Sequence, residues 1–181
     1  MEWILMYRLI KPTIEMKTAY EAYINDWKDE SLTPVTSDLK DKTYEQMLDE
    51  FYRAEHDINL PKGYVPDSNY FFVNEHKELL GFVNIRHYLD DILFKIRGHI
   101  AYGLKPSARG KGLSKIMLEL AIEKAREKGI KNILMVCDKS NIASRKTIEA
   151  CGGVLKDEVY DVTDHEIIQR FWISYEEKNH E

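Results

Sequence analysis

The chain has 181 residues, of which 44% are hydrophobic and 31% are charged. This composition is typical of a globular protein, and the length makes one domain over residues 1–181 the expected organisation. With 26 basic and 31 acidic side chains the formal net charge is −5, which argues against non-specific nucleic-acid binding as the main role.

The cysteines and the N-terminal residues argue against a metalloprotein, a secreted protein and a membrane protein. Cys137 and Cys151 are expected to be small core residues, because free cysteine is among the most buried residue types. No further ligands stand at metal-binding spacing, so we expect no metal. Residues 1–10 contain Glu2 and Arg8 and no long apolar run. They predict neither a signal peptide nor a membrane span, which leaves the cytoplasm as the default location.

The first half of the chain predicts a strand and two helices. The hydrophobic pattern places them over residues 3–10, 14–28 and 44–57. The polar residues 29–42 are expected to form a loop, because Pro34 interrupts them. The aromatic residues of both helices recur at helical spacing, which favours core packing over a substrate pocket.

Two strands and a longer central strand follow, over residues 70–74, 79–87 and 93–104. A bend at Asp90-Asp91 separates the last two. Side chains alternate along the central strand, with Ile100, Tyr102 and Leu104 on one side and His99, Ala101 and Gly103 on the other. Pro106 then ends regular pairing.

The turn Arg109-Gly110-Lys111-Gly112 leads directly into an amphipathic helix over residues 113–128. A helix N-terminus has unpaired N–H groups and a partial positive charge, and glycines let a phosphate approach the backbone. Two cations beside those amides predict an anion site, for which a pyrophosphate is the best match. Ordinary loop residues are the alternative, and the turn fits neither the Walker pattern nor the dinucleotide fingerprint.

The rest of the chain predicts a strand, a helix, two terminal strands and a tail, over residues 132–137, 142–151, 154–160, 167–175 and 176–181. The strand–helix–strand order from Ile96 to Cys137 predicts a parallel pair joined by a right-handed crossover. Ser140 or Asn141 is expected to cap the helix that follows.

Two of these stretches together resemble a known family. Arg109-x-x-Gly112-x-Ser114 resembles the Arg/Gln-x-x-Gly-x-Gly/Ala signature of the GNAT superfamily of N-acetyltransferases. Asn141-x-x-Ser144, on a helix that closes at Gly152-Gly153, resembles the second motif of that family. The similarity covers about residues 70–175 and is strongest over 98–153. The strings Ile85-Arg86-His87 and Gly98-His99-Ile100 are similar to a bacterial branch of predicted acetyltransferases whose substrates are unknown.

This resemblance implies a mixed α/β (α+β) acyl-CoA acyltransferase fold. Its central sheet is mostly antiparallel, with one parallel strand pair splayed around the coenzyme A site and helices on both faces. The resemblance also implies acetyl-CoA as co-substrate, and a primary amine of a small molecule or peptide that attacks it directly, without a covalent enzyme intermediate. No nucleic-acid or membrane partner is expected, and a homodimer is an open alternative.

The resemblance further implies which residues hold the cofactor. The backbone from Arg109 through Gly110, Lys111, Gly112 and Leu113 to Ser114 would hold the pyrophosphate, with Arg109 or Lys111 near the adenosine phosphate. The backbone near Gly103 and Leu104 would pair with the pantetheine arm, and an amide near Leu104 would donate to the thioester oxygen. Asn141 and Ser144 would contact the cofactor. Helix capping is an equal and compatible role for Asn141.

Catalysis needs a group that takes a proton from the amine. His99 stands where many relatives carry glutamate and titrates near neutrality, so it is the candidate base. A structural, hydrogen-bonded histidine is the alternative, and His87 is a weaker candidate base. Relatives commonly carry a tyrosine at the position of Ile148, as acid for the leaving thiolate. Here Tyr102 or Tyr160 would serve instead, or no acid is needed.

Three functions therefore compete. An acetyl-CoA-dependent N-acetyltransferase leads. A CoA-binding sensor or regulatory module without efficient turnover comes second, because the tyrosine is missing, although a histidine at the base position speaks against it. A different phosphate-binding protein that converged on the glycine turn is third. The acceptor amine is not identified by any motif.

Overall fold

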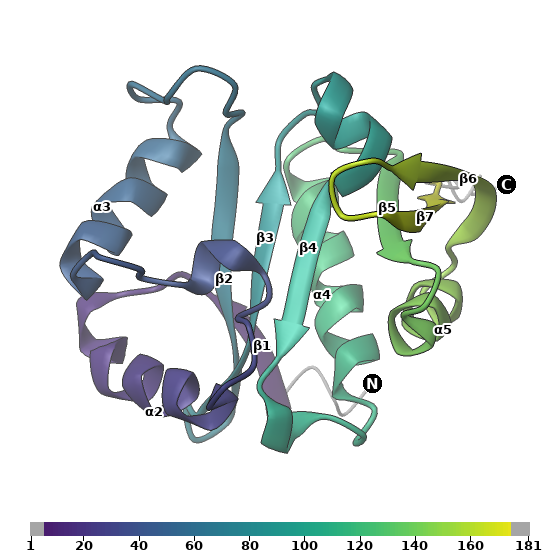
Figure 1. Ribbon diagram of the computed structural model, residues 1–181. Coiled ribbons are helices and arrows are strands. Elements are labelled where there is room, and N and C mark those ends of the chain that lie inside the picture. The colour runs from purple at the N-terminus through teal and green to yellow at the C-terminus, as the bar shows by residue number, and fades with distance from the viewer. Residues whose placement is uncertain (1–5, 175–181) are drawn as a thin grey trace, which may run out of the picture.

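The computed structural model describes residues 6–174, and within them the strands form two antiparallel sheets (Figure 1). The first sheet has the order β1 (Tyr7–Ile10), β2 (Asp67–Asn74), β3 (Leu79–Arg86) and β4 (Ile100–Leu104). The second sheet has the order β5 (Ile133–Asp138), β7 (Glu166–Ile173) and β6 (Val154–Asp161). The first residues of the predicted strand 3–10, the last residue of the predicted strand 167–175 and the predicted tail 176–181 lie outside the described residues.

Helices cover both faces of the first sheet. On one face, α2 (Lys17–Trp27) and α3 (Tyr44–Glu55) pack through Tyr20, Tyr23 and Met47 against Phe71 and Phe82. The short helices η1 (Ile14–Met16) and η2 (Val35–Ser37) flank α2. Residue Thr43 caps α3 with a capping box that also uses Gln46, which fixes where that helix begins.

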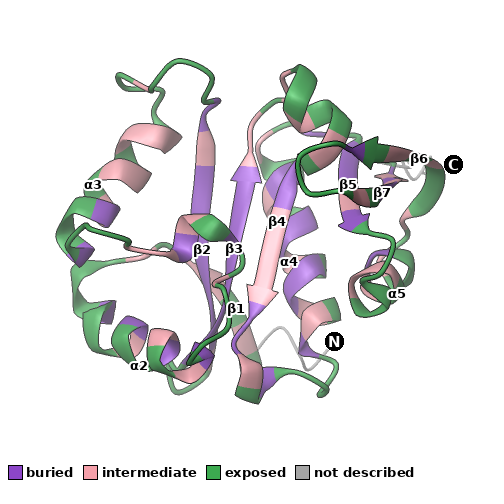
Figure 2. Cartoon of the chain, in the orientation of Figure 1, coloured by how far each residue is buried: buried purple, intermediate pink, exposed green. Residues whose placement is uncertain are grey.

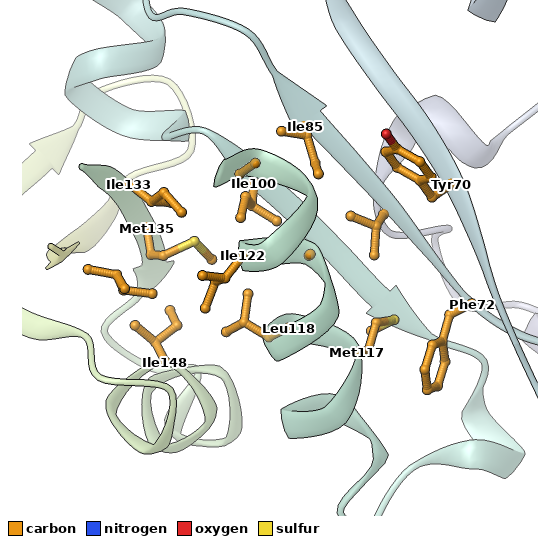
Figure 3. Packing of buried hydrophobic residues seen from close by; sticks show 14 of the residues in the cluster. Tyr70, Phe72, Ile85, Ile100, Met117, Leu118, Ile122, Ile133, Met135 and Ile148 are labelled. Atoms are coloured by element: carbon orange, nitrogen blue, oxygen red, sulfur yellow. The ribbon is translucent and has the colours of Figure 1, made fainter. Parts of the chain in front are cut away.

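The opposite face packs on α4 (Leu113–Glu127), which follows the short helix η4 (Pro106–Ala108). Figure 3 shows Met117, Leu118 and Ile122 of α4 pointing among side chains of both sheets. On this amphipathic helix Leu118 and Ile122 are buried, whereas Ile116 and Leu120 are only partly buried. The helix α5 (Ile142–Ala150) packs beside α4 and contributes Ile148 to this core.

The two sheets meet where β4 and β5 begin. The His99 N–H donates to the Leu134 carbonyl at 2.8 Å, but no ladder joins β4 to β5 beyond that point. Figure 1 shows β5 beside the start of β4, with α5 below β5 and away from the end of β4. The expected mixed α+β fold with a splayed strand pair is therefore confirmed, and the splay is complete enough to make two sheets.

The prediction of a strand over residues 93–104 is wrong in its first part. Residues Leu93–Arg97 form a short helical segment, η3. The Asp90 carboxylate accepts the Leu93 N–H at 2.8 Å, and Gly98, at φ +67°, ends the segment. A local cap and a left-handed glycine thus outweigh the β-propensity of Leu93, Phe94 and Ile96.

Candidate active site

The glycine turn predicted as an anion site precedes α4 in the structure. Gly110 and Gly112 have φ of +74° and +76°, and a Cβ added to either would meet no atom within 4 Å. Gly112 is the N-cap residue, and no side chain caps α4. The first N–H groups of a 15-residue helix are thus left for a ligand, in front of open space. The residues present fit a phosphate group.

The two cations of the turn are held by neighbours. The Arg109 Nη1 donates to Glu30 at 2.7 Å and its Nε to the Leu104 carbonyl at 3.1 Å, while the guanidinium lies 4.9 Å from the Trp27 ring centre. Lys111 Nζ donates to the Ser107 carbonyl at 2.8 Å. Arg109 therefore ties the turn to the end of α2, and the backbone amides and exposed Lys111 are better placed for a phosphate.

The outer edge of β4, which does not pair with β3, faces the space where β4 and β5 diverge, called the splay below. The pairing of β4 with β3 and the Lys105 N–H bond to the Leu80 carbonyl show that odd-numbered residues of β4 bond to β3. The N–H groups of Tyr102 and Leu104 therefore point away from β3, toward the space beside β5. Figure 2 shows the middle of β4 as partly exposed, unlike most of β3. An extended ligand chain can pair with this edge.

The loop between α2 and α3 closes over the other face of β4. A Cβ on Gly103 would lie 2.1 Å from the Thr33 carbonyl oxygen, so glycine is needed for this close approach. Gly103 is thus required for packing, whatever ligand its strand binds.

Tyr102 spans the splay to α5. Its hydroxyl lies 3.2 Å from Ser144 Oγ, and burial raises its pKa to about 12. The Asn141 Oδ1 accepts the Ser144 N–H at 3.0 Å, so the expected capping role of Asn141 is confirmed. The structure thus brings Tyr102, Asn141 and Ser144 together at the N-terminus of α5, across the splay from the outer edge of β4.

Ile148 and Tyr160 lie apart from that group of polar atoms. Ile148 is fully buried and points into the core with Leu118 and Met135 (Figure 3). Tyr160 is 53% exposed, and its hydroxyl contacts His165 Nδ1 at 3.2 Å. Of the two tyrosines considered as acids, only Tyr102 has its hydroxyl beside the splay.

His99 is buried, and its ring completes the junction between the sheets. The Leu134 N–H donates to His99 Nδ1 at 2.9 Å, so the proton of the neutral ring is on Nε2. Burial and the positive charge of Arg86 lower the pKa of His99 to about 4. The nitrogen that would accept a proton is therefore already occupied, which favours the structural alternative for His99.

His87 lies in a separate polar cluster. Its Nε2 is 2.8 Å from Ser68 Oγ, which in turn donates to Glu55 at 2.9 Å. Glu55 also pairs with Lys11 and Lys128. Burial lowers the pKa of His87. These contacts tie the ends of β1, α3 and α4 together and explain His87 without a catalytic role.

Two substitutions separate the roles of His99. We expect His99→Ala to lower stability by about 1–3 kcal/mol, because it leaves the buried Leu134 N–H without its acceptor. His99→Asn keeps an acceptor oxygen near the position of Nδ1, so stability and turnover should both stay near wild type. Thermal unfolding and acetyl transfer measure the two effects.

The pH dependence of stability gives a second readout. Because folding depresses the pKa of His99, the stability that it contributes is present above pH 6.5 and is lost as the pH falls toward 4. The wild type should lose more stability over that range than His99→Asn. A folded His99→Asn protein with turnover reduced about 100-fold would instead support the base role.

Sequence reasoning ranked a substrate pocket in this region below core packing, but the structure has a cavity on the α3 side of the sheet. It has a volume of about 340 Å³ and lies between α3, the loop after η2 and the start of β2. Asp67 and Asn69 of β2 line it, together with Phe51 and Tyr64. The predicted strand began at residue 70, so these polar residues were assigned to a loop.

Two further features hold across residues 6–174. No group of three or more His, Cys, Asp or Glu side chains there could hold a metal ion. Every helix in the same range is too short or too polar to cross a membrane.

Comparison with known proteins identifies the relatives of this chain. Residues 20–152 match the Acetyltransferase (GNAT) family. No curated protein sequence matches the chain.

Solved structures share the fold at low sequence identity. Ribosomal-protein-S5-alanine acetyltransferase from Vibrio fischeri has a TM-score of 0.68 at 16% identity, with 94% of this chain and 93% of that chain covered. RimL, a ribosomal L7/L12 alpha-N-protein acetyltransferase in complex with coenzyme A, has a TM-score of 0.66 at 15% identity, with 94% of this chain and 94% of that chain covered. A spermidine N-acetyltransferase chimera from Vibrio cholerae and hSSAT has a TM-score of 0.63 at 14% identity, with 93% of this chain and 95% of that chain covered.

Proposed function

This chain belongs to the GNAT family of acetyltransferases, and we propose that it transfers the acetyl group of acetyl-CoA to a primary amine of a small molecule or peptide. The observation that carries this proposal is the N-terminus of α4. That helix begins at a left-handed glycine without a side-chain cap, next to the unpaired edge of β4. A cofactor with a pyrophosphate and an amide-rich arm matches both features.

The backbone N–H groups of residues 110–114 would hold the pyrophosphate, with Lys111 nearby. The N–H groups of Tyr102 and Leu104 would pair with the pantetheine arm, and Asn141 and Ser144 would line the other side of the splay. Arg109 would act indirectly, because its contacts with Glu30 and Trp27 hold the turn in place.

Bound acetyl-CoA supplies the thioester carbonyl that the amine attacks. A backbone N–H on the edge of β4 stabilises negative charge on an oxygen placed beside it. The Tyr102 hydroxyl, held by Ser144, donates a hydrogen bond to a sulfur that leaves as thiolate. His99 can take the amine proton only if the Leu134 N–H gives up Nδ1. Otherwise a water on the open side of β4 takes that proton.

A CoA-binding sensor is the second candidate function, and Ile148 is the observation that favours it. The residue is buried, so that position of α5 offers no proton donor. Release of thiol from acetyl-CoA across a panel of amines separates the two functions. Binding without any amine-dependent thiol release would support the sensor.

Thermal unfolding with acetyl-CoA, ATP and NAD tests the proposed site. Acetyl-CoA at about 100 times its Kd should stabilise the protein by about 2.7 kcal/mol. For a chain of this size that free energy raises Tm by roughly 5–10 °C. Stabilisation by ATP or NAD without stabilisation by acetyl-CoA would contradict the proposal. It would instead support a different phosphate-binding protein that converged on the glycine turn.

A further inference from the structure

The cavity beside α3 lies apart from the proposed cofactor site. It is bounded by α3, by the segment from Val35 to Lys42, by the loop between α3 and β2, and by the start of β2. Among the described residues that line it, none belongs to β4 or to the glycine turn before α4. Figure 1 shows β3 and β4 between β2 and the splay. A ligand in this cavity would therefore not take the place of acetyl-CoA.

The lining of the cavity is largely apolar and includes the rings of Phe51 and Tyr64. The other apolar side chains are Val35, Met47, Ala54, Ile58, Leu60 and Pro61. The volume of about 340 Å³ is roughly twice that of an engineered cavity that holds benzene. Because aromatic pairs gain free energy beyond the area that they bury, the cavity suits a molecule with one or two aromatic rings.

The charges of the lining balance one another. Three lining residues are cationic and three are anionic, namely Lys40, Lys42 and Arg53, and Asp38, Glu50 and Asp67. Lys42 and Glu50 also pair directly with each other. The lining as a whole therefore has no net attraction for an ion of either sign, which favours a neutral ligand.

Two polar groups of the lining can still form hydrogen bonds with such a ligand. The Asp67 carboxylate accepts the Asn69 amide at 2.8 Å, and a carboxylate has acceptor sites for further donors. The Thr36 hydroxyl oxygen is buried and has no hydrogen-bond partner among residues 6–174, which costs free energy until a partner is supplied. The cavity thus combines an apolar body with a few polar contacts, as small-molecule sites do.

The surroundings of Asp67 favour a neutral donor over a cation. Arg86 lies opposite Asp67 in the register of β2 and β3. Burial raises the pKa of Asp67, while the positive charges of Arg86 and Lys11 act in the opposite direction. Those two cations would repel an added ammonium group. A neutral N–H or O–H group can donate to the carboxylate without that repulsion.

We propose that this cavity is a second ligand site, which binds a small neutral aromatic molecule carrying one N–H or O–H donor. The aromatic body lies against Phe51 and Tyr64, and the donor binds the Asp67 carboxylate. The inference does not depend on acetyl transfer, because the cavity and the proposed cofactor site share no residue.

Three small molecules test the class of ligand. Indole and benzofuran have nearly the same shape, but only indole has an N–H donor, and benzamidinium is an aromatic cation. Their Kd values are measured by titration calorimetry on the full chain, with and without acetyl-CoA. We expect indole to bind at least about fivefold more tightly than benzofuran, and also more tightly than benzamidinium. Acetyl-CoA should not displace indole.

Two variants and a control locate the site. Ala54→Phe puts a ring into the cavity and should abolish indole binding. Ala150→Phe makes the same change at an exposed position of α5 outside the cavity, and should leave indole binding unchanged. Asp67→Asn keeps an oxygen for the Asn69 amide but turns an N–H toward the ligand. It should lose the preference for indole and keep the Kd for benzofuran.

Several outcomes would overturn the inference. They are equal Kd values for indole and benzofuran, no measurable binding of indole, and tighter binding of benzamidinium. Indole binding that persists in folded Ala54→Phe, or that acetyl-CoA displaces, would place the ligand elsewhere and have the same consequence. Failure of the wild type to bind acetyl-CoA would overturn the proposed function alone, because the Kd for indole is also measured without it.

Discussion

Replacing Gly112 with glutamate is expected to weaken acetyl-CoA binding about 100-fold or more. A carboxylate about 4 Å from a phosphate costs about 4 kcal/mol at the effective dielectric of a protein surface. It also competes for the same N–H groups at the start of α4. The Cβ itself would meet no atom within 4 Å, so the protein should fold. Titration of acetyl-CoA into the folded variant measures the loss.

Gly129→Glu is the control for backbone strain. Gly129 follows the other end of α4, has φ of +84° and also has open space where a Cβ would lie. Both substitutions force a side chain into the left-handed region at a cost of about 1–2 kcal/mol. Similar decreases in Tm are therefore expected, but only Gly112→Glu should lose acetyl-CoA binding. Unchanged affinity in Gly112→Glu would move the cofactor away from this turn.

The fold was predictable where local signals agree with one another. Pro106, the glycine turn and the apolar stripe that follows marked the end of β4 and the start of α4. Thr43 marked no boundary in the prediction, which placed the helix start at Tyr44 from apolar spacing alone. In the structure the capping box at Thr43 begins the helix at that same residue. The prediction failed at Leu93–Arg97, where β-forming residues follow Asp90 and precede Gly98. Periodicity alone does not show that these two residues impose a helical turn.

The candidate site was predictable in its backbone and not in its side-chain contacts. Glycines and a helix start are adjacent in sequence, so the left-handed glycine turn before an uncapped helix could be predicted from the turn itself. The ion pair of Arg109 with Glu30 joins residues 79 positions apart, and the partner of His99 Nδ1 is a backbone N–H. Neither contact can be predicted from the types of the residues alone. The start of β2 was assigned to a loop because Asp67 and Asn69 have low strand propensity.

Replacing Tyr102 with phenylalanine is expected to lower kcat about 100-fold with little change in the Kd for acetyl-CoA. The variant removes the hydroxyl that we propose donates to the leaving sulfur, and the loss of one such donor typically has this magnitude. A pKa of about 12 keeps the phenol protonated at neutral pH. A thiolate is a much weaker base than that phenolate, so in the proposed mechanism Tyr102 would stabilise the sulfur by hydrogen bonding rather than by complete proton transfer.

That distinction predicts the pH profile. Because Tyr102 does not titrate between pH 6 and 9, the loss caused by Tyr102→Phe should be constant across that range. Tyr160→Phe is the matched control and should leave kcat unchanged, since its hydroxyl contacts His165 away from the splay. A loss that disappears at low pH would show that solvent protons replace a true acid. A wild-type rate for Tyr102→Phe at every pH would remove the tyrosine from the mechanism and leave the backbone N–H groups of β4 as the main source of stabilisation.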